Sequence, residues 1–157
     1  MAFLLESNFN YSGDVAGAFG LFGIAGALAA AVVGKLNDRM SKIKIITYAG
    51  LGLLVSWIIF YFSGYSILGL ILGVILVDLA VQALHITNQN IIFANNPEAR
   101  NRVNTIYMVG FFIGGALGTS LAAIAWKYFN WKGVSLLGFS LSVVIMLVHL
   151  LNQKKNY

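Results

Sequence analysis

The chain has 157 residues, of which 59% are hydrophobic and only 10% are charged. Soluble domains carry roughly 25% charged residues, so this composition predicts an all-α integral membrane protein with lipid as its main solvent. Cysteine is absent, which excludes disulfides and thiolate metal sites. The net charge of +5 does not indicate nucleic-acid binding, because the basic residues lie in short loops beside apolar runs.

Five apolar segments are long enough to cross a bilayer, which takes about 20 residues each. The predicted helices span about 14–33, 43–62, 67–92, 103–126 and 134–151, so residues 1–157 are expected to form one transmembrane helical domain. The first residues carry no basic region and only a short apolar run, so we expect no signal peptide.

Small residues recur at four-residue spacing on the first and fourth predicted helices. They are Gly23, Ala27 and Ala31 on the first helix, and Gly110, Gly114 and Gly118 on the fourth. In lipid, helices associate through such small-residue faces, because the backbones can then approach closely. On the first helix this face predicts either tight packing or a smooth surface along which helices slide, and on the fourth helix it predicts close packing.

The segment 34–44, between the first two predicted helices, is the densest cluster of charge in the chain. It contains Lys35, Arg39, Lys42, Lys44 and the acid Asp38. Such a basic loop beside an apolar run is typical of the cytoplasmic face of a membrane.

Two further polar segments separate the remaining helices. In the segment 95–102, Asn96 can cap a helix with Pro97 at its first position and Glu98 in its first turn, so the fourth helix is expected to begin near Pro97 or Val103. The segment 126–132 is rich in aromatic residues and is expected to be a loop.

The basic residues divide unequally between the two sides of the predicted bundle. One side holds Lys35, Arg39, Lys42, Lys44, Arg100, Arg102, Lys154 and Lys155, and the other holds Lys127 and Lys132. The positive-inside rule places the richer side in the cytoplasm of a multi-pass cell (inner) membrane protein, with the N-terminus outside and the C-terminus inside. Five helices satisfy this arrangement. Aromatic residues would then form a belt at the outer interface, namely Trp126, Tyr128 and Trp131 with Tyr61 and Tyr65.

A polar stripe runs along the third predicted helix. Asp78 lies near its middle, followed by Gln82, His85 and Gln89 at spacings that place all four on one helix face. An ionisable residue at that depth indicates a functional site. The stripe either forms a hydrogen-bond network between helices or lines a central cavity in which Asp78 or His85 takes up a proton or contacts substrate.

No enzymatic signature accompanies this stripe. His85 and His149 are isolated from the spacings typical of metal sites, and His149 is expected near the membrane interface. The glycines lie at helix-packing spacing inside apolar runs, which argues against a nucleotide-binding loop. We therefore expect no enzyme activity, no metal and no cofactor.

The residues 34–44 resemble the loop signature of the major facilitator superfamily of secondary transporters, which reads roughly G-x-L-a-D-r-x-G-r-[rk]. Gly34, Leu36, Asp38, Arg39 and Lys42 match it, whereas Ser41 replaces the usual second glycine. Residues 78–90 with 96–102 are similar to bacterial efflux-type members, and residues 107–126 also resemble the family.

This resemblance implies the last five helices of a twelve-helix fold, that is, most of its C-terminal half. It also implies a conformational latch, in which Gly34 and Asp38 act with the start of the fourth helix and with Arg39, Arg100 or Arg102. A carboxylate is favoured at a helix N-terminus on physical grounds as well. The substrate would lie near the midplane between two halves.

The expected function is therefore a part of a secondary transporter, moving a small molecule by alternating access with proton coupling or efflux. Because one half can line only one wall of the pathway, we expect the chain alone to be inactive without the N-terminal half. Two alternatives stay open: a free-standing membrane protein that assembles as a homo-oligomer without transport, and an intramembrane enzyme using Asp78 and His85, which lacks a nucleophile beside His85.

Overall fold

The structure is a computed structural model that describes residues 4, 6, 33–35 and 39–155. Its elements in chain order are α4 (Lys42–Phe62), α5 (Ile67–Asn95), the short 3-10 helix η2 (Pro97–Ala99) and α6 (Arg100–Lys155), and the described residues contain no strand. The predicted all-α class is confirmed. The helix expected at 14–33 lies outside the described residues except for its last residue, Val33, which is helical.

Helix α4 is flanked by two capping serines, which form hydrogen bonds with backbone groups at its ends. The Ser41 side chain accepts a hydrogen bond from the Lys44 N–H at 3.4 Å. At the other end, the Ser63 N–H donates to the carbonyls of Ile59 and Phe60, at 2.9 and 3.3 Å. These contacts replace intrahelical bonds that the terminal residues lack, which matters most where water is scarce.

Helix α5 follows after a tight turn. The Ser66 N–H donates to the Ser63 carbonyl at 3.0 Å, and the Ser66 hydroxyl then caps α5 by accepting from the Gly69 N–H at 3.3 Å. The helix has 29 residues, or about 43 Å, which exceeds the roughly 30 Å hydrocarbon core. It therefore either tilts in the bilayer or extends beyond its core.

The connection from α5 to α6 differs in detail from the prediction. Pro97 begins the 3-10 helix η2 and α6 begins at Arg100, but the Asn96 side chain makes no capping bond to η2. Its Nδ2 donates instead to the Ile92 carbonyl at 3.1 Å, so it terminates α5.

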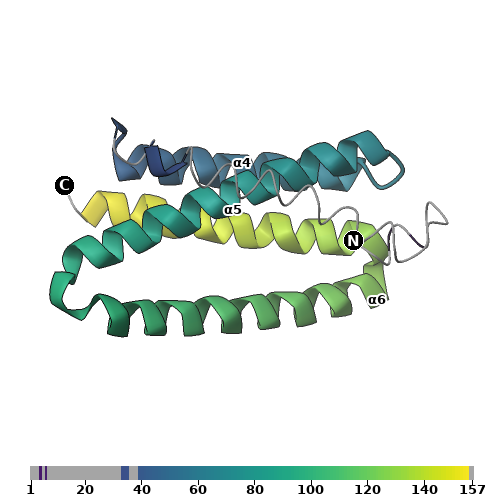
Figure 1. Ribbon diagram of the computed structural model, residues 1–157. Coiled ribbons are helices and arrows are strands. Elements are labelled where there is room, and N and C mark those ends of the chain that lie inside the picture. Colours follow the sequence, from purple (N-terminus) through teal and green to yellow (C-terminus); the bar gives the residue numbers. More distant parts are fainter. Residues whose placement is uncertain (1–3, 5, 7–32, 36–38, 156–157) are drawn as a thin grey trace.

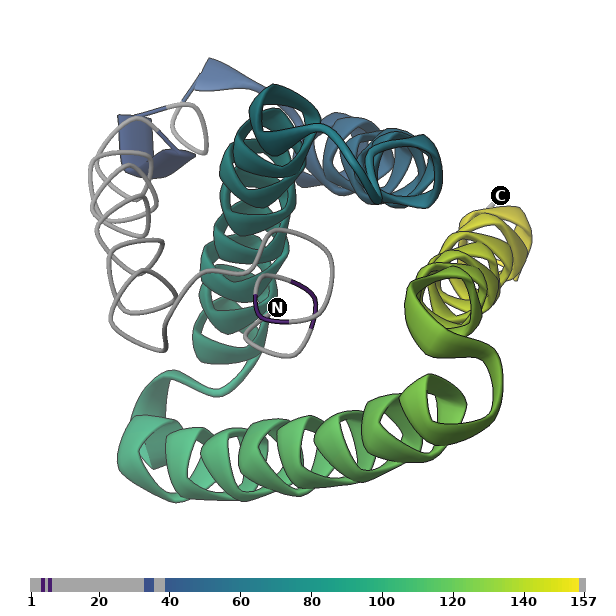
Figure 2. The same cartoon turned by 90° about the vertical axis from the view of Figure 1, so that its right-hand side faces the viewer.

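Helix α6 is two antiparallel limbs joined at Asn130, the one residue inside it with non-helical backbone angles (φ 52°, ψ −148°). Figures 1 and 2 show the first limb (residues 100–129) running along one side of the molecule and the second limb (131–155) returning beside α4. The aromatic segment 126–132, expected as a loop, is helical on both sides of Asn130. The chain therefore reverses its direction at a single residue, Asn130.

The backbone of Asn130 is strained, since its φ and ψ lie where a Cβ is strongly disfavoured. We expect Asn130→Gly to raise the free energy of unfolding by about 1 kcal/mol, because glycine adopts this conformation without steric cost. Asn130→Ala should lower it. Reversible unfolding in mixed detergent micelles, followed by tryptophan fluorescence, measures both changes, and equal effects of the two substitutions would contradict the strain.

An aromatic core joins α4, α5 and the second limb at the end of the bundle where the chain reverses. Phe60 and Trp131 are 4% and 7% exposed and meet edge to face, with ring centroids 5.7 Å apart. The Trp131 indole N–H also donates to the Phe60 carbonyl at 2.6 Å. The prediction that Trp131 belongs to an interfacial belt is therefore wrong, because the ring is enclosed between helices, whereas Tyr65 and Tyr128 are exposed.

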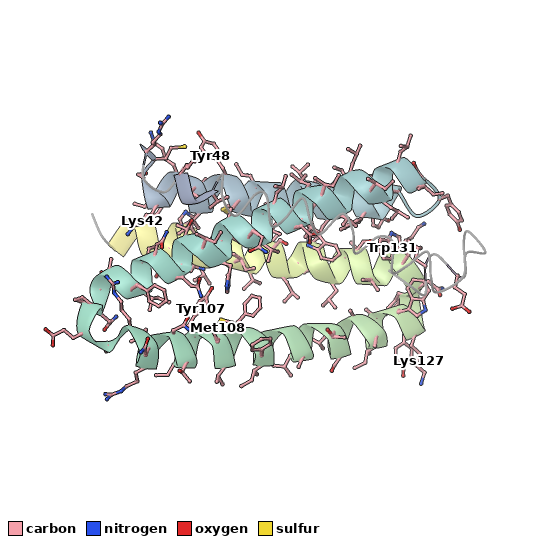
Figure 3. All side chains as sticks on the ribbon, viewed as in Figure 1. Lys42, Tyr48, Tyr107, Met108, Lys127 and Trp131 are labelled. Atoms are coloured by element: carbon pink, nitrogen blue, oxygen red, sulfur yellow. The ribbon has the colours of Figure 1, made fainter. Side chains whose placement is uncertain are left out.

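Charge separates between the two ends of the bundle. Arg39, Lys42 and Lys44 precede or begin α4, and Arg100 and Arg102 begin α6, which places all five at one end. Lys127 and Lys132 lie at the opposite end, beside the reversal at Asn130. Figure 3 shows this separation for Lys42 and Lys127. The apolar stretches between the two ends are the membrane-spanning parts.

Candidate functional site

The polar stripe of α5 faces the first limb of α6. Asp78, Gln82, His85 and Gln89 are all partly buried, and two of them contact side chains of that limb. The four residues share one helix face. Among the described residues, His85 and Gln89 form hydrogen bonds with α6, and Asp78 and Gln82 form none.

His85 forms the first contact between these helices. Its Nδ1 lies 3.0 Å from the Tyr107 hydroxyl, which is also 3.5 Å from the His85 carbonyl oxygen. The Phe111 ring lies 4.8 Å from the imidazole, centroid to centroid. Tyr107 and Phe111 are four residues apart, so they lie on one face of α6 and enclose the imidazole from two successive turns.

Gln89 forms the second contact, one turn nearer the connection between α5 and α6. Its Nε2 donates to Asn104 Oδ1 at 3.3 Å and lies 3.9 Å from Met108 Sδ. Figure 3 shows Tyr107 and Met108 pointing from α6 toward α5. Together the contacts of His85 and Gln89 join the two helices over about 6 Å of helix length.

Asp78 and Gln82 lie further along the same face, where Figure 1 shows α5 and the first limb diverging. Asp78 is about 10 Å from His85 along the helix axis and about 16 Å from the start of α5, near half the thickness of a bilayer core. Among the described residues, no side chain forms a hydrogen bond or ion pair with Asp78 or Gln82. The hydrogen bonds of His85 and Gln89 agree with a network between helices, whereas a cavity lined by Asp78 stays a prediction.

We predict that the contact between His85 and Tyr107 is weakly stabilising. In a double-mutant cycle with Tyr107→Phe and His85→Phe, a coupling of about 0.6 kcal/mol is expected, up to about 1.7, as for other hydrogen bonds between helices in lipid. Unfolding in mixed detergent micelles gives the four free energies. The pair Thr105→Val and His85→Phe is the control, since the Thr105 hydroxyl donates to the Asn101 carbonyl of its own helix. A coupling as large in this control pair would contradict the contact between His85 and Tyr107.

The predicted latch residues are only partly described. Asp38 lies outside the described residues, so its latch role stays a prediction. Arg39, Arg100 and Arg102 are exposed at the same end of the bundle, and Gly34 has no described atom within 4 Å of where a Cβ would stand.

The predicted packing glycines of the fourth helix have no neighbour among the described residues. A Cβ at Gly110, Gly114 or Gly118 would meet no described atom within 4 Å. Close contacts involve other glycines. A Cβ at Gly138 would overlap the Trp57 ring, and one at Gly73 would lie 2.5 Å from the Phe60 ring.

Some contacting residues escaped the sequence reasoning. Asn104, Tyr107 and Phe111 follow a three- and four-residue spacing that marks one helix face, a signal that was present but overshadowed by the glycines. His149, for which a position near the membrane interface stays a prediction, places its Nε2 2.9 Å from Thr47 Oγ1 of α4. No group of three His, Cys, Asp or Glu that could hold a metal occurs among the described residues.

The architecture defines the class of protein as a multi-pass membrane protein built from helices. Within the described part of the chain, three helices are long and apolar enough to cross a membrane, namely Lys42–Phe62, Ile67–Asn95 and Pro97–Gln153, the last folded back on itself at Asn130.

The chain belongs to the Major Facilitator Superfamily, which it matches over residues 1–156. It is 46% identical over 149 residues to the uncharacterized transporter YgaY of Escherichia coli strains K12 and O157:H7, a match that covers 94% of this chain. It is 35% identical over 119 residues, or 76% of this chain, to the "Probable transporter SCO4007" of Streptomyces coelicolor. No solved structure matches the chain significantly.

The chain spans 38% of the length of YgaY, and the match to SCO4007 spans 27% of that protein. The resemblance to this family drawn from residues 34–44 is confirmed by these matches.

Proposed function

We propose that this chain forms one wall of the substrate pathway of a secondary transporter for a small molecule, working by alternating access. Family membership and relatives named as transporters support this activity. The observation that carries the proposal is the polar face of α5, whose acid at mid-depth has no bonding partner among the described residues. An unpaired carboxyl group is costly in lipid and is retained where it contacts water, protons or substrate.

We assign two roles along this face. Asp78 and Gln82 line the pathway, and Asp78 exchanges a proton with it. His85 and Gln89 hold α5 against α6 through Tyr107 and Asn104. Movement of α6 relative to α5 would break these contacts first, so they are suited to respond to the conformational change.

The proposed orientation follows the charge. The end of the bundle with Arg39, Lys42, Lys44, Arg100 and Arg102 faces the cytoplasm, and the end with Lys127 and Lys132 faces outside. In this orientation, Asp38 would contact the start of α6 and its arginines as a latch on the cytoplasmic side.

The glycine face of α6 is the proposed contact surface for further helices of the transporter. Gly110, Gly114 and Gly118 leave the backbone of the first limb open, which suits close approach of another helix. The same face would also serve a homo-oligomer without transport. Crosslinking of the Gly114→Cys variant in membranes distinguishes a contact with further transporter helices from a homo-oligomer. A dimer crosslinked through two copies of this cysteine favours the homo-oligomer.

The absence of cysteine gives a direct test of the pathway face. In membranes, the single cysteine of Asp78→Cys should react with a charged thiol reagent that requires water. The matched control is Leu79→Cys, one residue on and about 100° around the helix, which should stay unreactive. Equal rates at the two positions would contradict a water-accessible face at Asp78.

A further inference from the structure

A cavity lies at the basic end of the bundle, away from the polar face of α5. It has a volume of about 520 Å³, within the range of about 300–1,000 Å³ typical of ligand sites. Three segments enclose it: the start of α4, the last turns of α5 and the end of the second limb of α6. On α5, its residues Leu84, Asn88 and Ile91 lie roughly 120° around the helix from the stripe of Asp78 and His85.

The polar lining of this cavity suits an anion. Lys42 supplies a positive charge, and Asn88, Asn152 and Gln153 supply amide groups that can donate hydrogen bonds. The described acids are Glu6, Asp78 and Glu98, and none of them lines the cavity. His149 also faces it, with its Nε2 engaged by Thr47 and by Gln153.

The remaining residues that line the cavity are aliphatic, and several of them are exposed on the outer surface of the helix bundle. Ile43, Ile145 and Val148 are 47%, 43% and 53% exposed, so the apolar wall continues onto the outer surface of the bundle. Because Lys42 is the first residue of an apolar spanning helix, the cavity lies where hydrocarbon meets the headgroup region.

We propose that this cavity binds an anionic phospholipid, with the phosphate held by Lys42 and the amides and an acyl chain along the aliphatic wall. A cationic pocket between helices at this depth fits a lipid phosphate, because the ligand is charged at one end and apolar at the other. A soluble phosphate would use the charge but leave the aliphatic wall uncovered.

Native mass spectrometry of the full chain in detergent tests the proposal with phosphatidylglycerol and phosphatidylcholine of identical acyl chains. Phosphatidylglycerol should be retained preferentially. Lys42→Gln should weaken its binding about fivefold, since one lysine near a headgroup contributes about 1 kcal/mol. Lys42→Arg, which keeps the charge, should retain it. Asn88→Leu, which leaves the charge unchanged, should weaken it about two- to threefold.

Lys44→Gln is the matched control, because Lys44 lies on the same turn of α4 but does not line the cavity. Equal weakening by Lys42→Gln and Lys44→Gln would show diffuse surface attraction and overturn the site. Equal retention of the two lipids would overturn its anion selectivity. Displacement of phosphatidylglycerol by millimolar inorganic phosphate would assign the cavity to a soluble anion instead. None of these results depends on transport, so they leave the proposed function to its own test.

Discussion

Replacement of Asp78 by Asn is expected to reduce the proposed proton-driven transport by roughly tenfold or more, since Asp78 has no bonding partner among the described residues and an acid at this depth indicates a functional site. Asn is nearly isosteric with the protonated acid but cannot release a proton. The chain would be co-expressed with the part of YgaY that it does not match, and a pH-sensitive dye inside membrane vesicles would report the flux.

Glu98→Gln is the matched control for this experiment. It makes the same chemical change at an exposed position of η2, at the end of the bundle where α5 connects to α6, and should leave the flux within about twofold of the unchanged protein. The chain by itself should give no flux above empty vesicles. Unchanged flux with Asp78→Asn would remove the proton role from Asp78, and flux through the chain alone would contradict its dependence on further helices.

Replacement of Gly138 by Ala is expected to destabilise the bundle by about 1–3 kcal/mol, the usual effect of overpacking a tight contact. A Cβ at this position overlaps the Trp57 ring, and Trp57 packs against Phe60, with centroids 5.3 Å apart. Either the indole or the second limb must move, and both belong to the contact between α4 and α6. Unfolding in mixed detergent micelles, followed by circular dichroism, measures the change.

Gly114→Ala makes the same substitution on the open face of α6 and should change the stability by less than about 0.5 kcal/mol. A destabilisation as large as that of Gly138→Ala would show that the glycine face of the first limb is packed within the isolated chain. It would then no longer be available to further helices.

The sequence and the structure agree best where a hydrocarbon environment requires the chain to be helical. In lipid every backbone group must be bonded within its own segment, so an uninterrupted apolar run has to form a helix, as at Lys42–Phe62 and Ile67–Asn95. The shared face of Asp78, Gln82, His85 and Gln89 likewise followed from residue spacing alone. The family followed from residues 34–44, because a loop signature is local.

The sequence could not show which side chains of different helices contact each other. Helical period places His85 and Gln89 on one face, yet which helix meets that face depends on how the segments pack. The structure selects Tyr107 and Asn104 for these two residues and leaves Asp78 without a described partner.

The glycines also show the difference between what sequence spacing predicts and what helix packing decides. Four-residue spacing identified Gly110, Gly114 and Gly118 as a packing face, but these three make no close contact among the described residues. Gly138, which belongs to no four-residue glycine repeat, does make one, and so does Gly73, which follows Gly69 at that spacing. Spacing shows which side of a helix is smooth, while the approach of a bulky ring such as Trp57 decides which glycine is needed. Likewise, residues 126–132 looked like a loop by polarity and aromatic content, whereas the reversal occurs at Asn130 alone.

The sequence by itself determined the all-α class, the presence of the apolar helices α4 and α5 and the family, since each depends on local composition and period. Only the tertiary structure decided which polar side chains are bonded, that Trp131 is enclosed in the core, and that a basic cavity forms beside Lys42. These depend on contacts between segments far apart in the chain, and such contacts are set by the packing of whole helices.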